Sequence, residues 1–362
     1  MRRANLFQHK PLSLPGVRVG IACMLIGGYR VEVELARGWV RENRIRRALI
    51  QAPPGLRGIA NKLVEELSSS LEEALLHGGG CWGGCDLAVA HARAVGADGI
   101  IHLGHARFLD EDPMPCIYLE CRRADPEPLI RALEGNMKSL EGFERIGLGA
   151  TVQWLDHMDL LKRLLGERGI RARTSPPTPP LRYEGQVLGC AYQPLLKLSG
   201  EVDGYLIIGS RFHGLGLGLQ TEKPIFFLDP ELGAMGALGA ESEKLLRSRY
   251  GYIEEARGAR DLGIIVSIKP GQFRMRCAMR LKKLLERAGR KAEILIMDDV
   301  DMEMLRNSGF EAFINTACPR LSIEDQERIE LPILLPAEAL IMLGEARWEE
   351  MIKSPRYLAM EV

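Results

Sequence analysis

The sequence predicts an α/β protein built from three homologous parallel-sheet α/β domains in a pseudo-threefold arrangement. Three observations support this fold class. Short apolar runs alternate with amphipathic helical patterns along the 362 residues, two kinds of strand-like segment recur in the same order, and the recurrence interval is roughly a hundred residues. Alternating buried strands and helices are typical of parallel sheets joined by right-handed crossovers. The chain length also suggests two or three domains.

Each predicted unit opens with an apolar or β-branched run that leads into a loop containing Gly or Pro. The three runs are ALIQAPPGL from Ala48, IGLGATVQWL from Ile146 and GIIVSIKPGQ from Gly263. Apolar residues spaced at i, i+3, i+4 and i+7 follow in IANKLVEELSSSL, DHMDLLKRLLGERG and FRMRCAMRLKKLLERAG. Each unit is therefore expected to begin as strand, loop and helix.

Each unit closes with a short apolar segment that follows an acidic residue and precedes a polar or Gly-containing loop. These segments are GADGIIHLGH, EVDGYLIIGS and GFEAFINTAC, in which Asp98, Asp203 and Glu311 occupy the same place. Such runs are typical of strands buried in a parallel sheet. We expect three domains, at residues 1–140 with an N-terminal extension, 141–256, and 257–362 with a C-terminal tail.

Composition excludes several classes of protein. The chain has 48 Lys+Arg and 48 Asp+Glu, so its formal net charge is zero. This balance argues against binding to nucleic acid or to anionic membranes by general charge attraction. The apolar stretch from Val17 to Ile26 is interrupted by Arg18 and Gly20, so we predict no signal peptide, and no run is long enough for a membrane helix. A cytoplasmic location, in which thiols stay reduced, is expected.

Two of the eight cysteines occupy the same position in the repeat. Cys85 precedes Asp98 by thirteen residues, and Cys190 precedes Asp203 by the same number. Both follow a Gly, in GGCD and LGCA, and both are predicted to lie between a strand and a helix. Open α/β sheets build their ligand sites in loops of this kind.

The third unit has Asp298 at that position, but it has Cys318 just after its closing strand. Three units around a pseudo-threefold axis could therefore direct Cys85, Cys190 and Cys318 toward one point. Three cysteines suit an iron–sulfur cluster with one iron free of protein ligands, or a zinc site with an open position. The alternative is that all three are small apolar residues in buried turns.

The other five cysteines show weaker patterns. Cys81 forms C-x3-C with Cys85, but the usual radical-SAM signature is absent because its third place is Ala88. The remaining four are assigned to packing or have no matching second pair, and they are Cys23, Cys116, Cys121 and Cys277.

At the level of motifs, the chain resembles the archaeal enzymes of the first step of diphthamide biosynthesis, the 2-(3-amino-3-carboxypropyl)histidine synthases, which form a noncanonical radical-SAM family. The matching segments span all three units, and they include LIQAPPGL, GGCDLA, ADGIIHLGHARF, ATVQWL, GQVLGC, GSRFHGLGL, KPIFFLDPE, SIKPGQ and NTACPR. Two positions depart from the usual family pattern, Ala106 in place of a serine and Pro54 in place of an acidic residue.

The resemblance implies that Cys85, Cys190 and Cys318 bind a 4Fe-4S cluster whose open iron binds S-adenosylmethionine. It implies cleavage of the bond between sulfur and the methionine γ-carbon, which yields a 3-amino-3-carboxypropyl radical and methylthioadenosine. The radical is expected to attack the imidazole C2 of a histidine on translation elongation factor 2. A homodimer and an external electron donor are also implied, with no nucleic acid or membrane partner.

Candidate cofactor-binding residues lie in loops at strand ends. The KPGQ loop contains Lys269, Gly271 and Gln272, Arg320 follows Cys318 by two residues, and His105 follows a closing strand. Glycine loops let the backbone approach a ligand closely, and helix N-termini offer free N–H groups to a carboxylate. We assign no catalytic residue from the sequence.

Two alternatives remain open from the sequence. One is a quinolinate-synthase-like protein, in which three similar units surround a cluster that acts as a Lewis acid on a small substrate. The other is a non-catalytic electron-transfer or scaffold protein that keeps the fold and partners a catalytic paralogue.

Overall fold

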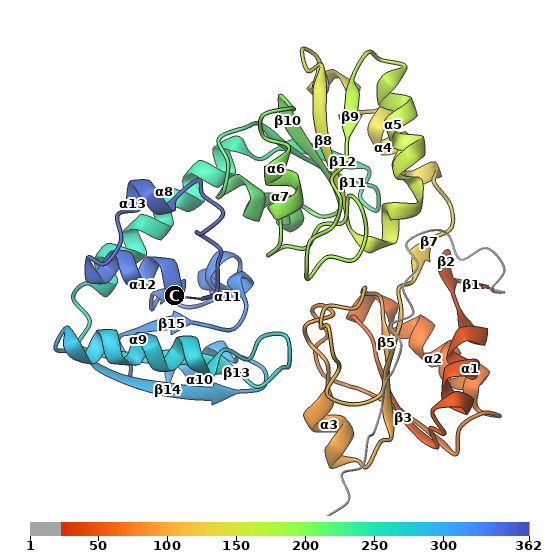
Figure 1. Cartoon of the computed structure of the whole chain (residues 1–362), viewed down its shortest axis with the longest axis horizontal. Helices are drawn as coiled ribbons and strands as arrows, with labels where there is room; N and C mark the ends of the chain where they lie inside the picture. Colours follow the sequence, from red (N-terminus) through yellow and green to blue (C-terminus); the bar gives the residue numbers. More distant parts are fainter. Residues whose placement is uncertain (1–22, 362) are drawn as a thin grey trace, which may run out of the picture.

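The computed structural model of the protein describes residues 23–361. The apolar stretch from Val17 to Ile26, for which no signal peptide is predicted, lies mostly outside the described residues. Three separate sheets stand at the corners of a triangle in Figure 1, each with its own helices. The α/β class is confirmed, and the triangle agrees with the pseudo-threefold arrangement that the repeats predict.

The first sheet is parallel and has the strand order β4-β3-β5-β6. Its strands are β3 (Arg47–Gln51), β4 (Glu73–Leu76), β5 (Gly99–Leu103) and β6 (Cys116–Leu119). Its helices are α1 (Val33–Glu42), α2 (Arg57–Leu67) and α3 (Val89–Ala94), with a 3-10 turn η1 (Pro54–Leu56). A small antiparallel sheet lies beside it, formed by β1 (Met24–Ile26), β2 (Tyr29–Val31) and β7 (Arg122–Arg123).

The second sheet has the order β12-β11-β10-β8-β9, in which only the edge strand β12 is antiparallel. Its strands are β8 (Arg145–Ala150), β9 (Arg171–Arg173), β10 (Gly204–Ile208), β11 (Ile225–Asp229) and β12 (Ala234–Ala237). The helical segments around it are α4 (Glu127–Glu134), η2 (Met137–Leu140), η3 (Val152–His157), α5 (Met158–Gly166), α6 (Gln193–Lys197) and α7 (Arg211–Gly218). Leu129 and Leu133 of α4 join the core of this sheet, although α4 precedes residue 140.

The third sheet is parallel and has the order β14-β13-β15-β16. Its strands are β13 (Asp261–Ser267), β14 (Lys291–Met297), β15 (Ala312–Asn315) and β16 (Ile333–Leu334). The helical segments of this part are α9 (Met275–Arg287), α10 (Met302–Arg306), α11 (Pro319–Ile323), η4 (Asp325–Arg328), α12 (Pro336–Leu343) and α13 (Trp348–Met351). The long helix α8 (Gly239–Ala256) connects the second and third sheets, and its Leu246 and Ile253 belong to a core shared by both.

The acidic residue that marks each closing segment has the same structural role in all three units. The carboxylates of Asp98, Asp203 and Glu311 accept hydrogen bonds from backbone N–H groups at the starts of β3, β8 and β13, at 2.8, 2.9 and 3.1 Å. Each opening strand also pairs in parallel with its closing strand, as β3 with β5, β8 with β10 and β13 with β15. The repeat in the sequence is therefore a repeat in hydrogen bonding.

Within the described residues, no helix combines the length and the apolar character that crossing a membrane would require. The longest, α8, carries charged residues along its length.

Candidate metal centre

Each of the three sheets carries one proposed cluster ligand on a loop, and two of these loops are at matching places. Cys85 lies in the loop between β4 and α3, and Cys190 lies in the loop between β9 and α6. These two loops are topologically equivalent, because each leads from an outer strand through a short helix into the closing strand. Cys318 follows the closing strand β15 and is the N-cap residue that directly precedes α11.

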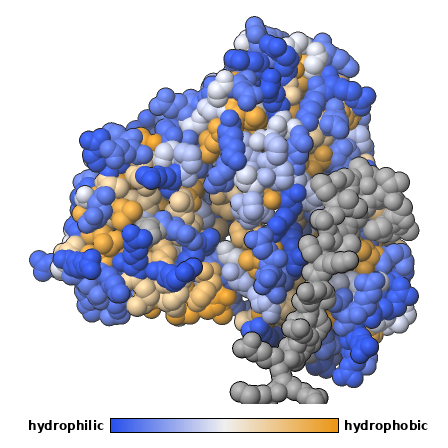
Figure 2. Space-filling model, in the orientation of Figure 1, coloured by the Kyte–Doolittle hydropathy of each residue, from blue (hydrophilic) through white to orange (hydrophobic). Residues whose placement is uncertain are grey.

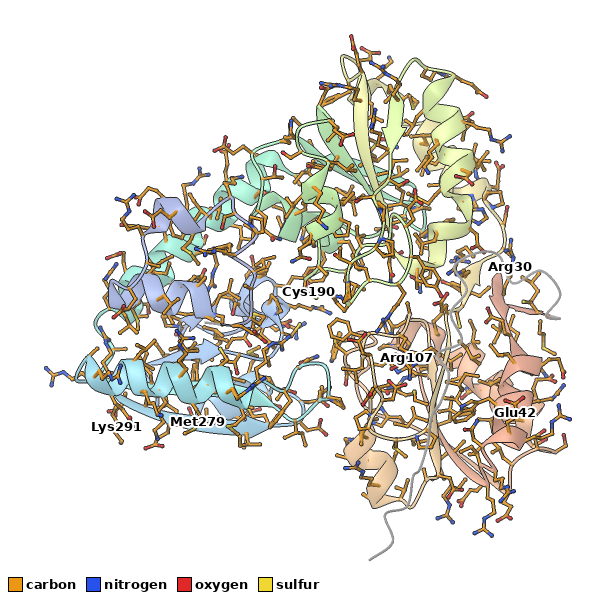
Figure 3. The ribbon with its side chains drawn as sticks, viewed as in Figure 1. Arg30, Glu42, Arg107, Cys190, Met279 and Lys291 are labelled. Atoms are coloured by element: carbon orange, nitrogen blue, oxygen red, sulfur yellow. The ribbon has the colours of Figure 1, made fainter. Side chains whose placement is uncertain are left out.

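The three thiols lie close enough to influence one another's ionisation. Burial raises the pKa of the Cys85 thiol, and charge on Cys318 and Cys190 raises it further. Burial, and then charge on Cys318, raises the pKa of Cys190 to about 12. Figure 3 places Cys190 near the centre of the view, on the side of the second unit that faces the other two. We call this group of Cys85, Cys190 and Cys318 the three-thiol junction, and none of its members forms a disulfide.

Cationic and hydrogen-bonding groups around the junction favour the thiolate form. Burial raises the pKa of Cys318, while the backbone N–H and the guanidinium of Arg320 lower it, as does Arg274. The Arg274 guanidinium also lowers the pKa of Cys190. The Gln272 side-chain amide donates to the Cys85 sulfur at 3.5 Å. Positive charge and N–H donors stabilise a thiolate, which is the form that binds metal.

The KPGQ loop of the third unit packs directly on Cys85 of the first. The Gly271 N–H donates to the Cys85 carbonyl oxygen at 2.9 Å. A Cβ atom at position 271 would come within 2.5 Å of the Cys85 Cα, so this approach requires glycine. The contact fixes the backbone of a proposed ligand.

Lys269 reinforces the same approach through its charge. Its ammonium lies 2.8 Å from Asp86 Oδ1 and 2.5 Å from Asp299 Oδ1. Burial raises the pKa of Asp86 to about 6, against the opposing effect of Lys269. The ammonium is thus paired with Asp86 of the first unit and Asp299 of the third. Lys269 therefore links these two units, and its charge is not free to bind a cofactor.

Arg320 lies where the three units meet. Its guanidinium carbon is 4.6 Å from the centre of the Trp82 ring of the first unit and 5.6 Å from that of Phe212 of the second. Its Nε lies 2.6 Å from Glu324 Oε2. Stacking on two aromatic rings holds the guanidinium beside Cys318.

His105 belongs to a second group of metal-binding residue types. Single ligand atoms of Cys81, His102 and His105 all lie within 4.8 Å of one another. Burial lowers the pKa of His105 to about 4, with a smaller contribution from His213. His105 is therefore a neutral imidazole near the junction.

Sequence reasoning missed the roles of three residues near the junction. Arg274 lies two residues beyond Gln272. The sequence around it did not indicate that its guanidinium would act on Cys190 and Cys318, which lie on other loops. Asp86 follows Cys85 directly, and an acid at the start of a buried segment was a usable signal. His102 and His105 form H-x2-H at the end of a strand, a spacing that could have been paired with Cys81.

The donor set at the junction fits an iron–sulfur cluster. Soft thiolates select iron–sulfur clusters, zinc or copper(I), and three thiolates leave one iron of a four-iron cluster without a protein ligand. The nearby arginines offset the negative charge that such a cluster carries. Cys85, Cys190 and Cys318 would hold the cluster, with one ligand from each unit.

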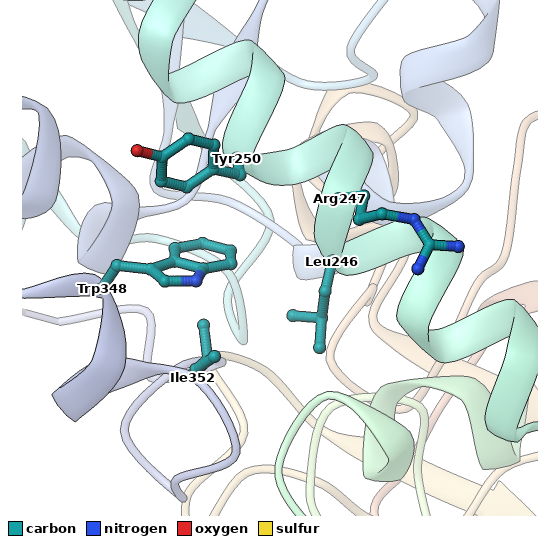
Figure 4. Close-up of a pocket in the computed structure, with 5 residues that line it drawn as sticks. All are labelled: Leu246, Arg247, Tyr250, Trp348 and Ile352. Carbon is teal, nitrogen blue, oxygen red and sulfur yellow. The ribbon is translucent and has the colours of Figure 1, made fainter.

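A separate surface pocket lies between α8 and α13. It is lined by Leu246, Arg247, Tyr250, Trp348 and Ile352, as Figure 4 shows. Its lining is chiefly apolar and includes no cysteine or histidine. This pocket therefore offers no chemistry comparable to that of the junction.

Comparisons with known proteins agree with the geometry. A family model for diphthamide synthesis proteins matches residues 52–353. A 2-(3-amino-3-carboxypropyl)histidine synthase of Pyrococcus horikoshii is 35% identical over 316 residues, which cover 86% of this chain and 90% of the relative. Subunit 1 of the human enzyme of that name is 24% identical, over 96% of this chain and 80% of the relative.

A solved structure shows the same fold. The crystal structure of Dph2 from Pyrococcus horikoshii with a 4Fe-4S cluster has a TM-score of 0.79 to this chain at 32% identity. The match covers 88% of this chain and 91% of that one.

Proposed function

The chain belongs to the diphthamide synthesis protein family, and from this premise we propose that it catalyses the first step of diphthamide formation. In this proposal it is a 2-(3-amino-3-carboxypropyl)histidine synthase. It transfers the 3-amino-3-carboxypropyl group of S-adenosylmethionine to the imidazole C2 of one histidine of translation elongation factor 2. Family membership sets aside the quinolinate-synthase-like alternative.

The three-thiol junction carries the proposal. Its thiols come from three units that are far apart in the sequence, yet charge on Cys318 raises the pKa of both Cys85 and Cys190. When bound, a 4Fe-4S cluster would supply the electron that breaks the bond between the sulfonium sulfur and the methionine γ-carbon. The protein's part is to hold three thiolates, to keep surrounding water away from them and to orient the sulfonium.

The five residues expected at the cofactor take two kinds of role in this proposal. Gly271 and Lys269 brace the Cys85 loop, because both contact Cys85 or its neighbour Asp86. Gln272 contacts the Cys85 sulfur, Arg320 acts on Cys318, and His105 lies beside Cys81, four residues before Cys85. We propose that these three contact S-adenosylmethionine, with the Arg320 guanidinium as the partner of its carboxylate.

The partners belong to the proposal as well. The protein substrate is translation elongation factor 2, and an external donor supplies electrons. A cytoplasmic location fits a substrate that is a translation factor, and the zero net charge fits a protein rather than a nucleic-acid partner.

We propose that a second copy of the chain docks on the third unit. Strand β14 is an edge strand of seven residues, and its pairing edge opposite β13 has no neighbour among the described strands. Ile296 on β14 and Met279 on α9 are 53% and 45% exposed, and the third unit shows apolar colour at the lower left of Figure 2. Edge strands pair readily with an identical strand about a twofold axis.

An anaerobic assay tests the function. The chain is reconstituted with iron and sulfide and incubated with dithionite, S-adenosylmethionine and elongation factor 2. Mass spectrometry is expected to find an aminocarboxypropyl group on one histidine of the factor, with methylthioadenosine released. A reconstituted chain with a full cluster that modifies nothing would instead support the non-catalytic paralogue.

A further inference from the structure

Cys81, His102 and His105 form a compact group in the first unit, which we call the Cys81 trio. Cys81 Sγ lies 3.9 Å from His102 Nε2 and 3.9 Å from His105 Nδ1. The two imidazole nitrogens are 2.9 Å apart. Cys81 is 2% exposed and His102 is fully buried. The three-thiol junction does not use any of these atoms.

The hydrogen bonds of Gln51 determine which nitrogen of His102 faces the trio. The buried Gln51 side chain donates from Nε2 to the Asp86 carbonyl at 2.7 Å and accepts at Oε1 from the Ala88 N–H at 3.0 Å. This fixes the orientation of the amide, because a carbonyl only accepts and a backbone N–H only donates. Gln51 Oε1 also lies 3.2 Å from His102 Nδ1.

Gln51 Oε1 can only accept a hydrogen bond, so His102 Nδ1 must donate to it. In a neutral His102 ring, the proton is therefore on Nδ1. The other nitrogen, Nε2, is then unprotonated and directs its lone pair toward Cys81 Sγ and His105 Nδ1. A histidine that binds a metal through one ring nitrogen usually donates the N–H of the other to an oxygen acceptor, as His102 does to Gln51.

The separations in the Cys81 trio are close to those of a zinc site. With Zn–S near 2.3 Å and Zn–N near 2.0 to 2.1 Å, tetrahedral ligands lie about 3.5 Å apart for sulfur and nitrogen and about 3.3 Å apart for two nitrogens. The trio differs from these values by only a few tenths of an ångström. One cysteine and two histidines are also a donor set that zinc accepts.

We propose that the Cys81 trio binds a single Zn²⁺ ion, beside the three-thiol junction and separate from it. Cys81 would bind as thiolate, His102 through Nε2 and His105 through Nδ1. The proton of His105 would then be on Nε2, and the contact proposed above between His105 and S-adenosylmethionine would use this N–H. Binding one Zn²⁺ releases the Cys81 thiol proton and leaves a fourth position for water. The ion would tie the loop that carries Cys81 and Cys85 to the end of β5, and thereby hold Cys85 in place. This inference does not rest on the proposed enzymatic function.

Zinc binding by the full-length chain tests the inference. The background is the Cys85→Ala, Cys190→Ala, Cys318→Ala variant, in which the proposed cluster thiols cannot capture the metal. It is titrated anaerobically with Zn²⁺ against a chelator, and bound zinc is counted by mass spectrometry after desalting. Co²⁺ serves as a second probe, because a thiolate ligand gives a charge-transfer band and tetrahedral geometry gives strong visible bands.

One bound Zn²⁺ per chain is expected in this background, together with the Co²⁺ thiolate band. Adding Cys81→Ser should abolish the band and weaken zinc affinity by at least 100-fold. Adding Gln51→Leu should weaken zinc affinity about 10- to 100-fold while all three ligands remain. Adding Cys116→Ser, which alters a cysteine of β6 outside the trio, should leave zinc binding and the Co²⁺ spectrum unchanged.

The absence of stoichiometric zinc and of the cobalt thiolate band in the background variant would overturn the inference. Equal zinc affinity of the Cys81→Ser and Cys116→Ser variants would overturn it too. Either outcome would show that the trio is a hydrogen-bonded group of the core. The cobalt spectrum of the background variant keeps the test decisive even if the Cys81→Ser chain does not fold.

Discussion

Two polar centres of the molecule differ in burial and in how completely their groups are satisfied. The first is the pair of Arg249 and Glu338 in the third unit, both fully buried. Arg249 donates to Glu338 Oε1 at 2.8 Å and to the carbonyls of Ser322 and Ile333 at 2.7 Å each. The Tyr357 hydroxyl donates to the same carboxylate at 2.6 Å.

The second centre is the three-thiol junction, where the polar groups have few partners. Burial raises the pKa of all three thiols, while Gln272 makes one long contact to Cys85 and the backbone N–H of Arg320 acts on Cys318. Burial keeps the thiols protonated and uncharged, yet arginines lie beside them. These arginines would stabilise the negative charge that the thiols acquire when they lose their protons to bind metal. Fully buried groups that satisfy one another hold the fold, whereas half-buried thiols with few partners are suited to binding a ligand.

Removing a thiol from the junction gives the sharpest contrast with the ion pair. Cys85→Ala, Cys190→Ala and Cys318→Ala should each reduce aminocarboxypropyl transfer to the background of a cluster-free preparation, because the fold needs none of these thiols. Circular dichroism and thermal unfolding of the unreconstituted chain should stay close to the parent. Cys277→Ser, in α9, is the matched control, and it should keep most of the transfer activity. A Cys190→Ala chain with parental transfer activity would contradict the assignment.

Breaking the ion pair of Arg249 and Glu338 should instead lower the stability of the fold. Glu338→Ala leaves the Arg249 guanidinium buried without its counter-ion, so the free energy of unfolding should fall by about 3 to 5 kcal/mol. The double variant Arg249→Met, Glu338→Leu should recover much of that loss, because no buried charge is left unpaired. Urea unfolding monitored by circular dichroism measures both changes. If the double variant were as unstable as Glu338→Ala, buried charge would not be the cause.

Gly271→Ala tests whether the KPGQ loop positions a ligand. The added Cβ would clash with Cys85, with the nearest backbone atom at 2.5 Å. We expect iron content after reconstitution to drop to half or less, while the global fold persists. Gly289→Ala is a matched glycine control in the same unit, since its Cβ position is open although its φ of +75° adds local strain. Normal iron content in Gly271→Ala would show that the loop does not hold Cys85.

The smallest effect is expected at the carboxylate of Asp98. Backbone N–H groups of Arg47 and Arg46 hold its pKa below the ordinary 3.8, so its contribution is present above that pH and is lost as the pH falls through the lower folded value. Asp98→Ala should cost about 1 kcal/mol at neutral pH, a modest figure because the group is exposed. The difference in unfolding free energy from the parent should shrink below pH 4, and a difference independent of pH would contradict this role.

Local patterns predicted the fold better than they predicted the site. The alternation of apolar runs and helical spacing identified the strands that start at Arg47, Arg145 and Asp261, because such periodicity is set by burial within one element. The spacing to Asp98 and Asp203 likewise placed Cys85 and Cys190 on equivalent loops. Pairings between distant segments leave no periodic trace, so the small sheet of β1, β2 and β7 was not predicted.

The same reason explains what the sequence did not reveal about the site. Lys269 and Asp86 are far apart in the chain and meet only because the first and third units dock. Arg274 has no local feature that would direct it toward Cys190. The boundaries drawn near residues 140 and 257 stay predictions, and α4 packs on the second sheet because its apolar face matches that core.

Iron and acid-labile sulfide per chain, measured after anaerobic reconstitution, test the central claim most directly. The parent chain should bind four irons and four sulfides in one cluster, while each single variant of Cys85, Cys190 and Cys318 should lose most of both. The three losses should be similar, because each unit supplies one ligand to the same cluster. A full complement of iron and sulfide in any one of the three variants would contradict the claim that three units share one cluster.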